Sequence, residues 1–299
     1  MGHENDDDRN MIPVTNHKRN VAKFFSGRTV YWRQIYDSKE ESISQYYHYF
    51  MEKRKAAVLA ALDRFSDGKS MKVLDAGCGP GALLEEVAKR GHAATGLDFS
   101  LDMVAQASWA VGNAGTKRTS FIQGDLDSLP FKDNSFDAVI CVGALQYLPD
   151  NRMSISELGR VLRPDGIAII TLPNLLRMNN LLDPIYYFRG LKYVLHLLSK
   201  KLPIWKTPPD PADFSTNEMF SNRRYFYGQL GADFRKSNLG TVDVVCIGFG
   251  PLTFWRRPFL SERLSLSISD RIERASRRAG FRWLGVFSNR WVISLRKAA

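Results

Sequence analysis

Two carboxylates and three glycines, in and after the stretch VLDAGCGPGALL, are the residues best suited to binding chemistry. Asp75 ends a short apolar run, glycines follow at positions 77, 79 and 81, and Asp98 ends the next apolar run. Glycine lets a chain bend sharply and lets a ligand lie against bare backbone. A strand, a glycine-rich turn and a helix in this order predict a nucleotide-binding loop.

The type of nucleotide is not decided by spacing alone. Residues 77–82 also satisfy the dinucleotide fingerprint G-x-G-x-x-G/A, with Asp98 about 20 residues further on, so an NAD site is one interpretation. Two residues disfavour a pyrophosphate there: Asp75 would repel it, and Pro80 has no N–H to donate to it. Both residues suit S-adenosylmethionine, because its sulfonium and ammonium are attracted to Asp75 and its ribose hydroxyls can donate to Asp98.

The elements that must position these residues are strands and helices in alternation. Helices are predicted directly after the glycines, after Ser100, at 152–162 and at 215–232, and much of 33–65 is also predicted to be helical. Continuous apolar strands that alternate with helices imply a parallel sheet covered on both faces, so the fold class is α/β and Rossmann-like. The predicted strands are residues 71–75, 93–98, 119–123, 136–142, 166–172, 241–249 and 290–297.

Charge is distributed unevenly along the chain, whose formal net charge is +11. Residues 1–172 contain 21 basic and 22 acidic residues, whereas residues 173–299 contain 21 basic and 9 acidic residues. The C-terminal part therefore carries the whole basic excess, which predicts an anionic partner for that part.

Four segments follow from these patterns. Residues 1–70 are predicted to form an N-terminal tail and a helical cap over the cofactor, and residues 71–172 the cofactor-binding core. Residues 173–214 form a hydrophobic and basic helical insertion, a substrate lid or a membrane contact. Residues 215–299 complete the sheet and include an arginine-rich insertion at 249–289.

Several classes of protein are disfavoured by composition. The acidic, polar start predicts no signal peptide, and no apolar run reaches the roughly 18 residues that span a bilayer. The three cysteines (Cys78, Cys141 and Cys246) have neither metal-ligand spacing nor a disulfide pattern. We therefore expect a cytoplasmic protein without a metal.

Four stretches resemble, in order and spacing, the successive motifs of class I S-adenosylmethionine-dependent methyltransferases. They are VLDAGCGPG, GLDFS, IQGDLDSLPFKDNSFDAVICVGALQYLPD and VLRPDGIAIITLPN, all between Met71 and Asn174. The pattern is most similar to the branch that contains the ubiquinone and menaquinone methylases. The resemblance implies S-adenosyl-L-methionine as cofactor. It also implies a seven-stranded, mostly parallel sheet with helices on both faces and an antiparallel last strand, at 290–297.

The resemblance also implies roles for individual residues. The methionine part of the cofactor would be held by the strand end and glycine turn, namely Asp75, Gly77, Cys78, Gly79 and Gly81, and the ribose by Asp98. The adenine would be flanked by Phe99 and Met103, with Asp125 and Leu126 at its amino edge. Val142, which follows the fourth strand, would lie beneath the cofactor.

The aromatic stretch before the core supplies three more candidates. Tyr36, Tyr47 and Arg54 could close over the cofactor, and Arg54 could pair with the methionine carboxylate. The alternative interpretation of this stretch is an amphipathic helix that packs on the sheet.

Methyl transfer from a sulfonium has a neutral leaving group and needs no metal or covalent enzyme intermediate. A base is useful only when the acceptor must lose a proton, as a hydroxyl does. The candidates for this catalytic role are Tyr147, His48 and His196. Tyr147 stands where quinone methylases often carry histidine, and a packed aromatic is the alternative interpretation of this residue.

The acceptor is indicated only by the later segments. Residues 186–200 can form a basic amphipathic helix suited to a membrane interface, or a lid helix packed on the core. Phe254 and Trp255 beside Arg256 and Arg257 are a combination found at headgroup depth. We therefore expect O-methylation of an amphipathic or lipid-linked small molecule (quinone-, isoprenoid- or glycolipid-like), with peripheral contact to an anionic membrane surface.

Other functions remain as alternatives. The protein could methylate a soluble small molecule or natural product, or it could methylate a nucleic acid. It could also be a binding protein without catalytic activity. Base-amino methyltransferases usually carry Asn/Asp-Pro-Pro-aromatic where this chain has VGALQYLPD, and no RNA-binding module is recognisable, so no nucleic-acid partner is expected.

Overall fold

The computed structural model describes residues 16–36, 45–116, 118–178, 182–184, 187, 224–255 and 257–299. Its strands are β1 Lys72–Ala76, β2 Ala93–Asp98, β3 Thr119–Gln123, β4 Phe136–Val142, β5 Leu162–Pro173, β6 Leu239–Ile247, β7 Thr253–Phe254, β8 Arg257–Pro258 and β9 Arg290–Lys297. Its main helices are α1 Asn16–Ser26, α2 Thr29–Tyr36, α3 Gln45–Ser66, α4 Ala82–Lys89, α5 Leu101–Asn113, α6 Arg152–Val161, α9 Tyr227–Lys236 and α10 Glu262–Ser276, with 3₁₀ segments η2 Leu145–Tyr147 and η4 Ala279–Phe287.

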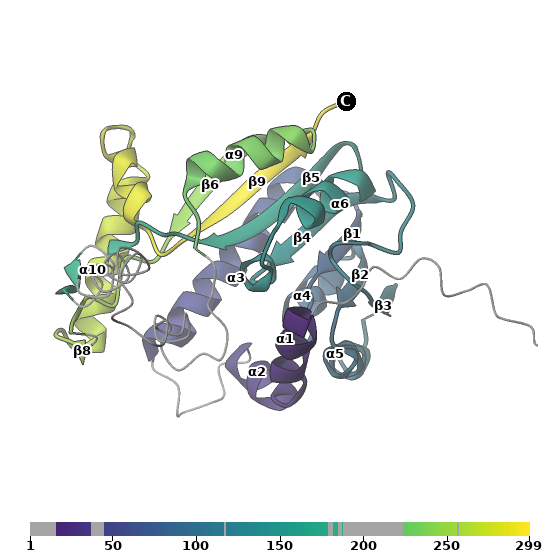
Figure 1. Cartoon of the computed structure of the whole chain (residues 1–299), viewed down its shortest axis with the longest axis horizontal. Coiled ribbons are helices and arrows are strands. Elements are labelled where there is room, and N and C mark those ends of the chain that lie inside the picture. Colours follow the sequence, from purple (N-terminus) through teal and green to yellow (C-terminus); the bar gives the residue numbers. More distant parts are fainter. Residues whose placement is uncertain are drawn as a thin grey trace, which may run out of the picture.

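A seven-stranded sheet in the order β3-β2-β1-β4-β5-β9-β6 forms the centre of the molecule (Figure 1). The pairs β1–β2, β2–β3, β1–β4 and β4–β5 are parallel. The last strand, β9, is inserted between β5 and β6 and is antiparallel to both. The predicted seven-stranded, mostly parallel sheet with an antiparallel last strand is therefore confirmed.

Each face of the sheet buries its own apolar cluster, because successive strand residues point to opposite faces. On one face, Leu74 and Val139 belong to a cluster that includes Leu158 of α6 and Phe234 of α9. On the other face, a second cluster joins the neighbouring strand residues to α3 and α4, with Val73, Ile140, Leu62, Leu84 and Val87 among its members. Both faces are therefore covered by helices, as Figure 1 shows.

One edge of the sheet collects the ends of several strands. Because β1, β2, β4 and β5 are parallel, their carboxyl ends at Ala76, Asp98, Val142 and Pro173 meet there. The antiparallel β9 starts at the same edge, since Arg290 pairs with Pro173. This edge is where an α/β sheet places a ligand.

The predicted helix at 215–232 is wrong in its central part. Residues 215–223 lie outside the described residues, and α9 begins only at Tyr227. Before it, the Tyr225 N–H donates to the carbonyl of Pro173 (3.1 Å), and Leu175 N–H donates back to Tyr225 (3.0 Å). Tyr225 is thereby held in an extended bridge that local helix propensity cannot overcome.

Most of the predicted insertion at 173–214, including the amphipathic stretch 186–200, lies outside the described residues. None of the helices in the described part of the chain is both long and apolar enough to cross a bilayer.

Candidate active site

In the glycine turn after β1, two glycines pack closely against neighbouring residues and a third borders open space. Gly77, Gly79 and Gly81 all have positive φ angles (83°, 51° and 81°), a region that L side chains rarely adopt. A Cβ on Gly77 would lie 2.5 Å from Cβ of Ala144, and one on Gly81 would lie 2.9 Å from Cβ of Ala107. A Cβ on Gly79 would meet no atom within 4 Å. The turn therefore presents open backbone at Gly79.

Two carboxylates flank this turn, of which Asp75 is buried and Asp98 is half-buried. Asp75 is 2% exposed, and its Oδ2 is buried without a hydrogen-bond partner among the described residues. Burial, and then the nearby charge of Asp98, raise the pKa of Asp75 to about 7. Asp98 accepts hydrogen bonds from the N–H groups of Gly79 and Ser100 (2.9 Å each), while its burial raises its pKa. A cation bound here would offset the cost of holding both acids away from water.

A cavity of about 490 Å³ opens at this edge of the sheet. It gathers residues from α2 and α3, the glycine turn, the ends of β2 and β4, η2, and the start of β9. The sequence-predicted residues that line it are Gly77, Gly79, Asp98, Phe99, Met103, Leu126, Val142, Tyr47, Arg54 and Tyr147.

The other predicted site residues are placed differently. Asp75, Cys78 and Gly81 belong to the same strand end and turn but are not part of the cavity lining. His48 lies on α3 and is also outside this lining. The side chain of Tyr36 and the whole of His196 lie outside the described residues.

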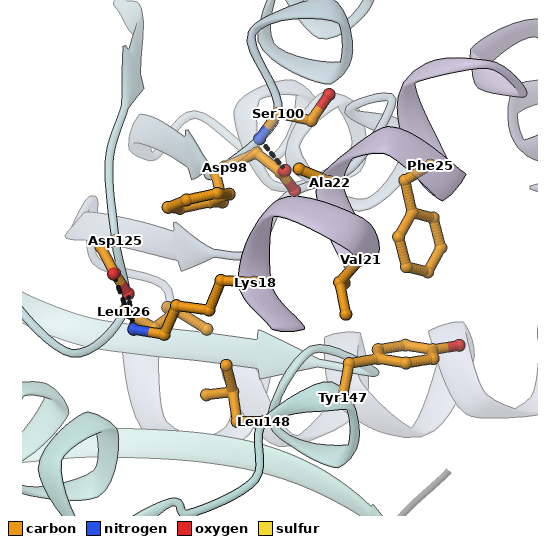
Figure 2. Close-up of a pocket in the computed structure, with 11 residues that line it drawn as sticks. Lys18, Val21, Ala22, Phe25, Asp98, Ser100, Asp125, Leu126, Tyr147 and Leu148 are labelled. Atoms are coloured by element: carbon orange, nitrogen blue, oxygen red, sulfur yellow. Dashed lines mark hydrogen bonds and ion pairs between the residues drawn. The ribbon is translucent and has the colours of Figure 1, made fainter. Parts of the chain in front are cut away.

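Asp125 lines a smaller neighbouring cavity of about 70 Å³, together with Asp98, Phe99 and Leu126. Its roof is α1, which lies in the segment 1–70 predicted to form a tail and a helical cap, although no residue of α1 was predicted as a site residue. Four residues of α1 face this cavity, namely Lys18, Val21, Ala22 and Phe25 (Figure 2). Their spacing of three, one and three residues is that of one helix face, and this was the signal available in the sequence.

Lys18 fixes α1 to the loop after β3. Its Nζ donates to both carboxylate oxygens of Asp125 (2.8 and 2.7 Å) and to Asp127 (2.5 Å), as Figure 2 shows for Asp125. Burial alone would lower the pKa of Lys18, but the two carboxylates outweigh it and the pKa is raised. Lys18 is therefore a charged partner of the residue predicted to lie at the amino edge of the adenine.

Three further contacts hold α1 in place. Ser26 Oγ lies 2.7 Å from Ser100 Oγ, and His17 Nε2 lies 2.8 Å from the carbonyl oxygen of Tyr147. The rings of Phe25 and Tyr147 meet edge to face, with centroids 5.0 Å apart. Tyr147 thus lines the cavity and also packs against α1, which is compatible with both interpretations of this residue.

Arginines line the side of the cavity away from Asp98. Arg54 of α3 is 4% exposed, and a Cβ on Gly143, directly after β4, would lie 3.3 Å from its Nη1. Arg177 and Arg290 line the cavity further along the sheet, and Arg290 Nη1 donates to Gln146 Oε1 (2.6 Å).

Tyr46 and Asn289 belong to the same region, with Asn289 Nδ2 3.4 Å from the Tyr46 hydroxyl. Burial raises the pKa of Tyr46, so this phenol stays protonated. Tyr46, Gln146, Arg177, Asn289 and Arg290 were all missed by sequence reasoning.

Comparison with known proteins agrees with this architecture. Residues 74–170 match the family model described as methyltransferase domain. Over 99 residues the chain is 41% identical to a sterol 24-C-methyltransferase of Gibberella zeae, covering 32% of this chain and 26% of that protein. Over 105 residues it is 37% identical to the demethylmenaquinone methyltransferase of Staphylococcus aureus, covering 34% and 42%. The chain thus spans less than half the length of these two relatives.

Among solved structures, magnesium protoporphyrin IX methyltransferase from Synechocystis, with bound S-adenosylhomocysteine, superposes with a TM-score of 0.57. The superposition covers 95% of this chain and 100% of that chain at 17% sequence identity, which is a likeness of fold. Residues 74–170 are therefore a methyltransferase domain, and the chain has the fold of class I S-adenosylmethionine-dependent methyltransferases. The predicted resemblance, including the relation to menaquinone methylases, is confirmed.

Proposed function

We propose that this protein is an S-adenosylmethionine-dependent methyltransferase that O-methylates an amphipathic or lipid-linked small molecule at a membrane surface. One observation carries the proposal of the cofactor: a buried carboxylate oxygen of Asp75 has no hydrogen-bond partner among the described residues, beside a glycine turn with open backbone. An unpaired buried acid is costly, and a cationic ligand offsets that cost.

The residues present fit this cofactor. Asp75 and the backbone at Gly79 would hold its methionine part, Arg54 its carboxylate, and Asp98 its ribose, since a carboxylate that accepts two hydrogen bonds retains lone pairs for more. Asp125 would lie at the amino edge of the adenine. When bound, S-adenosylmethionine supplies a methyl group on a sulfonium.

The chain itself contributes mainly alignment and exclusion of water. Aligned reactants can save about 7–11 kcal/mol of an activation barrier. The walls of the cavity include the apolar side chains of Phe25, Trp32, Phe50 and Met51, which would exclude water from the reactants they contact. Tyr147 is the candidate base that lines the cavity, so it is our first choice for receiving a hydroxyl proton, ahead of His48 and His196.

An apolar acceptor is supported by these walls and by the relatives. By their names, two relatives act on a sterol and on demethylmenaquinone. We extend an acceptor of this lipid-like kind to the present chain.

Contact with a membrane is supported by exposed aromatic side chains at both ends of α10. Phe254, Trp255 and Phe259 precede the helix, Phe281 and Trp283 follow it, and each of the five is at least 50% exposed. Between them, α10 carries exposed arginines at positions 263, 271 and 274. Exposed aromatics together with basic residues are typical of surfaces that bind the headgroup region of an anionic bilayer.

Cofactor binding is tested by titrating S-adenosylhomocysteine into the protein in a calorimeter. We expect saturable binding at one site, and an absence of binding would contradict the proposal. The acceptor is then sought by mass spectrometry of lipid and metabolite extracts, in which the methylated product is 14 daltons heavier than its precursor.

Membrane contact is tested by co-sedimentation with phosphatidylserine-containing vesicles at low salt. The double variant Trp255→Ser/Trp283→Ser is expected to pellet less than the wild type. The matched control is Trp109→Ser, because Trp109 is 66% exposed but lies on α5. Equal pelleting of the two variants, or no pelleting of the wild type, would contradict membrane contact and favour a soluble acceptor.

A further inference from the structure

Two arginines from separate segments line the end of the cavity furthest from the glycine turn. Arg177 follows β5 and Arg290 starts β9, and both are half-buried. The backbone of Arg290 is fixed by its pairing with Pro173 on one side and with Ile247 on the other. Its guanidinium donates to Gln146 Oε1 at 2.6 Å. The position of this cation is therefore set by the sheet.

Sheet order separates Arg290 from the residues proposed to hold the cofactor, and Arg177 follows β5, the strand beside β9. β9 is the second strand beyond β4 in the order β4-β5-β9, and β1 and β2 lie on the opposite side of β4. Since neighbouring strands are about 4.8 Å apart, Arg290 starts roughly 10 Å across the sheet from the end of β4. Arg54, which lies against Gly143 at that strand end, is better placed for the cofactor carboxylate.

The cavity is charged in opposite senses at its two ends. Among the described residues that line it, the one carboxylate is Asp98, which is hydrogen-bonded to Gly79 and Ser100 at the glycine turn. The far end combines Arg177 and Arg290 with the neutral polar groups of Gln146 and Asn289. Guanidinium groups in a half-buried, largely apolar cavity bind oxyanions well, because their planar donors match a carboxylate or a phosphate.

We infer that the methyl acceptor carries an oxyanion, a carboxylate or a phosphate, which Arg177 and Arg290 bind while its apolar body lies along the walls of the cavity. This inference rests on the proposed function and specifies its substrate class. The oxyanion fixes the orientation of the acceptor, and the opposite charge at Asp98 keeps the acceptor out of the cofactor half.

The test uses the full chain saturated with S-adenosylhomocysteine and three probes with the same eight-carbon body. Octyl phosphate, octanoate and 1-octanol are titrated by calorimetry. We expect at least one of the two anions to bind about tenfold or more tightly than the neutral alcohol, and the tighter of them identifies the headgroup. Equal binding of all three probes would overturn the inference.

Variants then assign the effect to the arginines. Arg290→Gln and, independently, Arg177→Gln are each expected to weaken binding of the preferred anion about tenfold. Both should leave the affinity for S-adenosylhomocysteine unchanged. The matched control is Arg235→Gln, at an exposed position on α9. Unchanged anion affinity in both cavity variants would overturn the inference.

Two results separate this inference from the proposed function. If S-adenosylhomocysteine does not bind in the first place, the proposed function fails. If it binds and Arg290→Gln weakens it as much as it weakens the anion, Arg290 serves the cofactor carboxylate, and only the inference about the acceptor fails.

Discussion

The two ends of the cavity are built in different ways. The end proposed for the cofactor, here the cofactor end, is lined by Gly77, Gly79 and Asp98 and directly follows the buried Asp75. These residues lie within one short stretch of chain and act through backbone and carboxylates. The end proposed for the acceptor, here the acceptor end, includes Gln146, Arg177, Asn289 and Arg290, which the fold brings together from distant parts of the sequence. One end is therefore a local motif, and the other is a product of the fold.

This difference has a functional consequence. The turn and the strand ends at the cofactor end are fixed by tight packing around glycines, which leaves little room for variation. The acceptor end depends on side chains at the ends of β5 and β9, which can change without altering the sheet. We therefore expect substitutions at the two ends to have separable effects on the two ligands.

The largest effect is expected from Asp98→Ala. Loss of a half-buried carboxylate that would accept both ribose hydroxyls should weaken S-adenosylhomocysteine binding about a hundredfold, measured by calorimetry. Arg290→Gln is the matched change at the acceptor end and should leave this affinity unchanged. A change of less than twofold in the Asp98 variant, with the melting temperature preserved, would remove Asp98 from the site.

We expect pH to change the affinity for S-adenosylhomocysteine about tenfold, through a group at the cofactor end. The pKa of Asp75 is about 7, so this group is mostly protonated at pH 6 and mostly ionised at pH 8. Because the ligand's ammonium favours the ionised form, S-adenosylhomocysteine affinity should rise about tenfold between these values. Asp75→Asn should abolish that rise, and a wild-type affinity that is flat or falls with pH would contradict the assignment.

The same pKa shift makes a prediction for the protein without ligand. The pKa of Asp75 is raised above its ordinary value of 3.8, so the folded state retains a proton that the unfolded state releases. This group's contribution therefore lowers the free energy of unfolding as the pH rises from about 4 to about 7. Comparing the denaturant midpoints of wild type and Asp75→Asn across this range isolates the contribution.

Sequence reasoning predicted the cofactor end because its signals are local. The continuous apolar runs of β1 and β4, the glycines, and the carboxylates at strand ends can all be recognised within a few residues. The strand at 290–297 was predicted with the bounds of β9, since its apolar residues stand between basic ends. Such features do not depend on which segments become neighbours.

The acceptor end could not be predicted in the same way. Arg290 becomes a site residue only because β9 enters the sheet between β5 and β6 and pairs with Pro173. No local pattern distinguishes it from the other arginines of the basic C-terminal part. Likewise, the start of α9 at Tyr227 depends on the bridge between Tyr225 and the end of β5, which is a contact between distant segments.

The smallest effect concerns α1, which lies in the segment predicted to form a tail and a helical cap but whose residues were not predicted to line the site. Lys18→Met removes the ion pairs with Asp125 and Asp127 that fix this roof. Partly buried pairs of this kind contribute modestly, so we expect S-adenosylhomocysteine to bind about threefold to tenfold more weakly, mainly through faster dissociation. Stopped-flow measurement of the dissociation rate checks this.

The control is Arg19→Met, which removes a neighbouring exposed charge of α1 and should leave the rate unchanged. Tighter binding in the Lys18 variant would contradict the proposal that α1 stabilises the bound cofactor, because it would mean that Lys18 competes with the ligand for Asp125. In that case the amino edge of the adenine must displace an existing ion pair, and α1 would oppose cofactor binding. The sign of this small effect therefore decides whether α1 belongs to the cofactor end or acts against it.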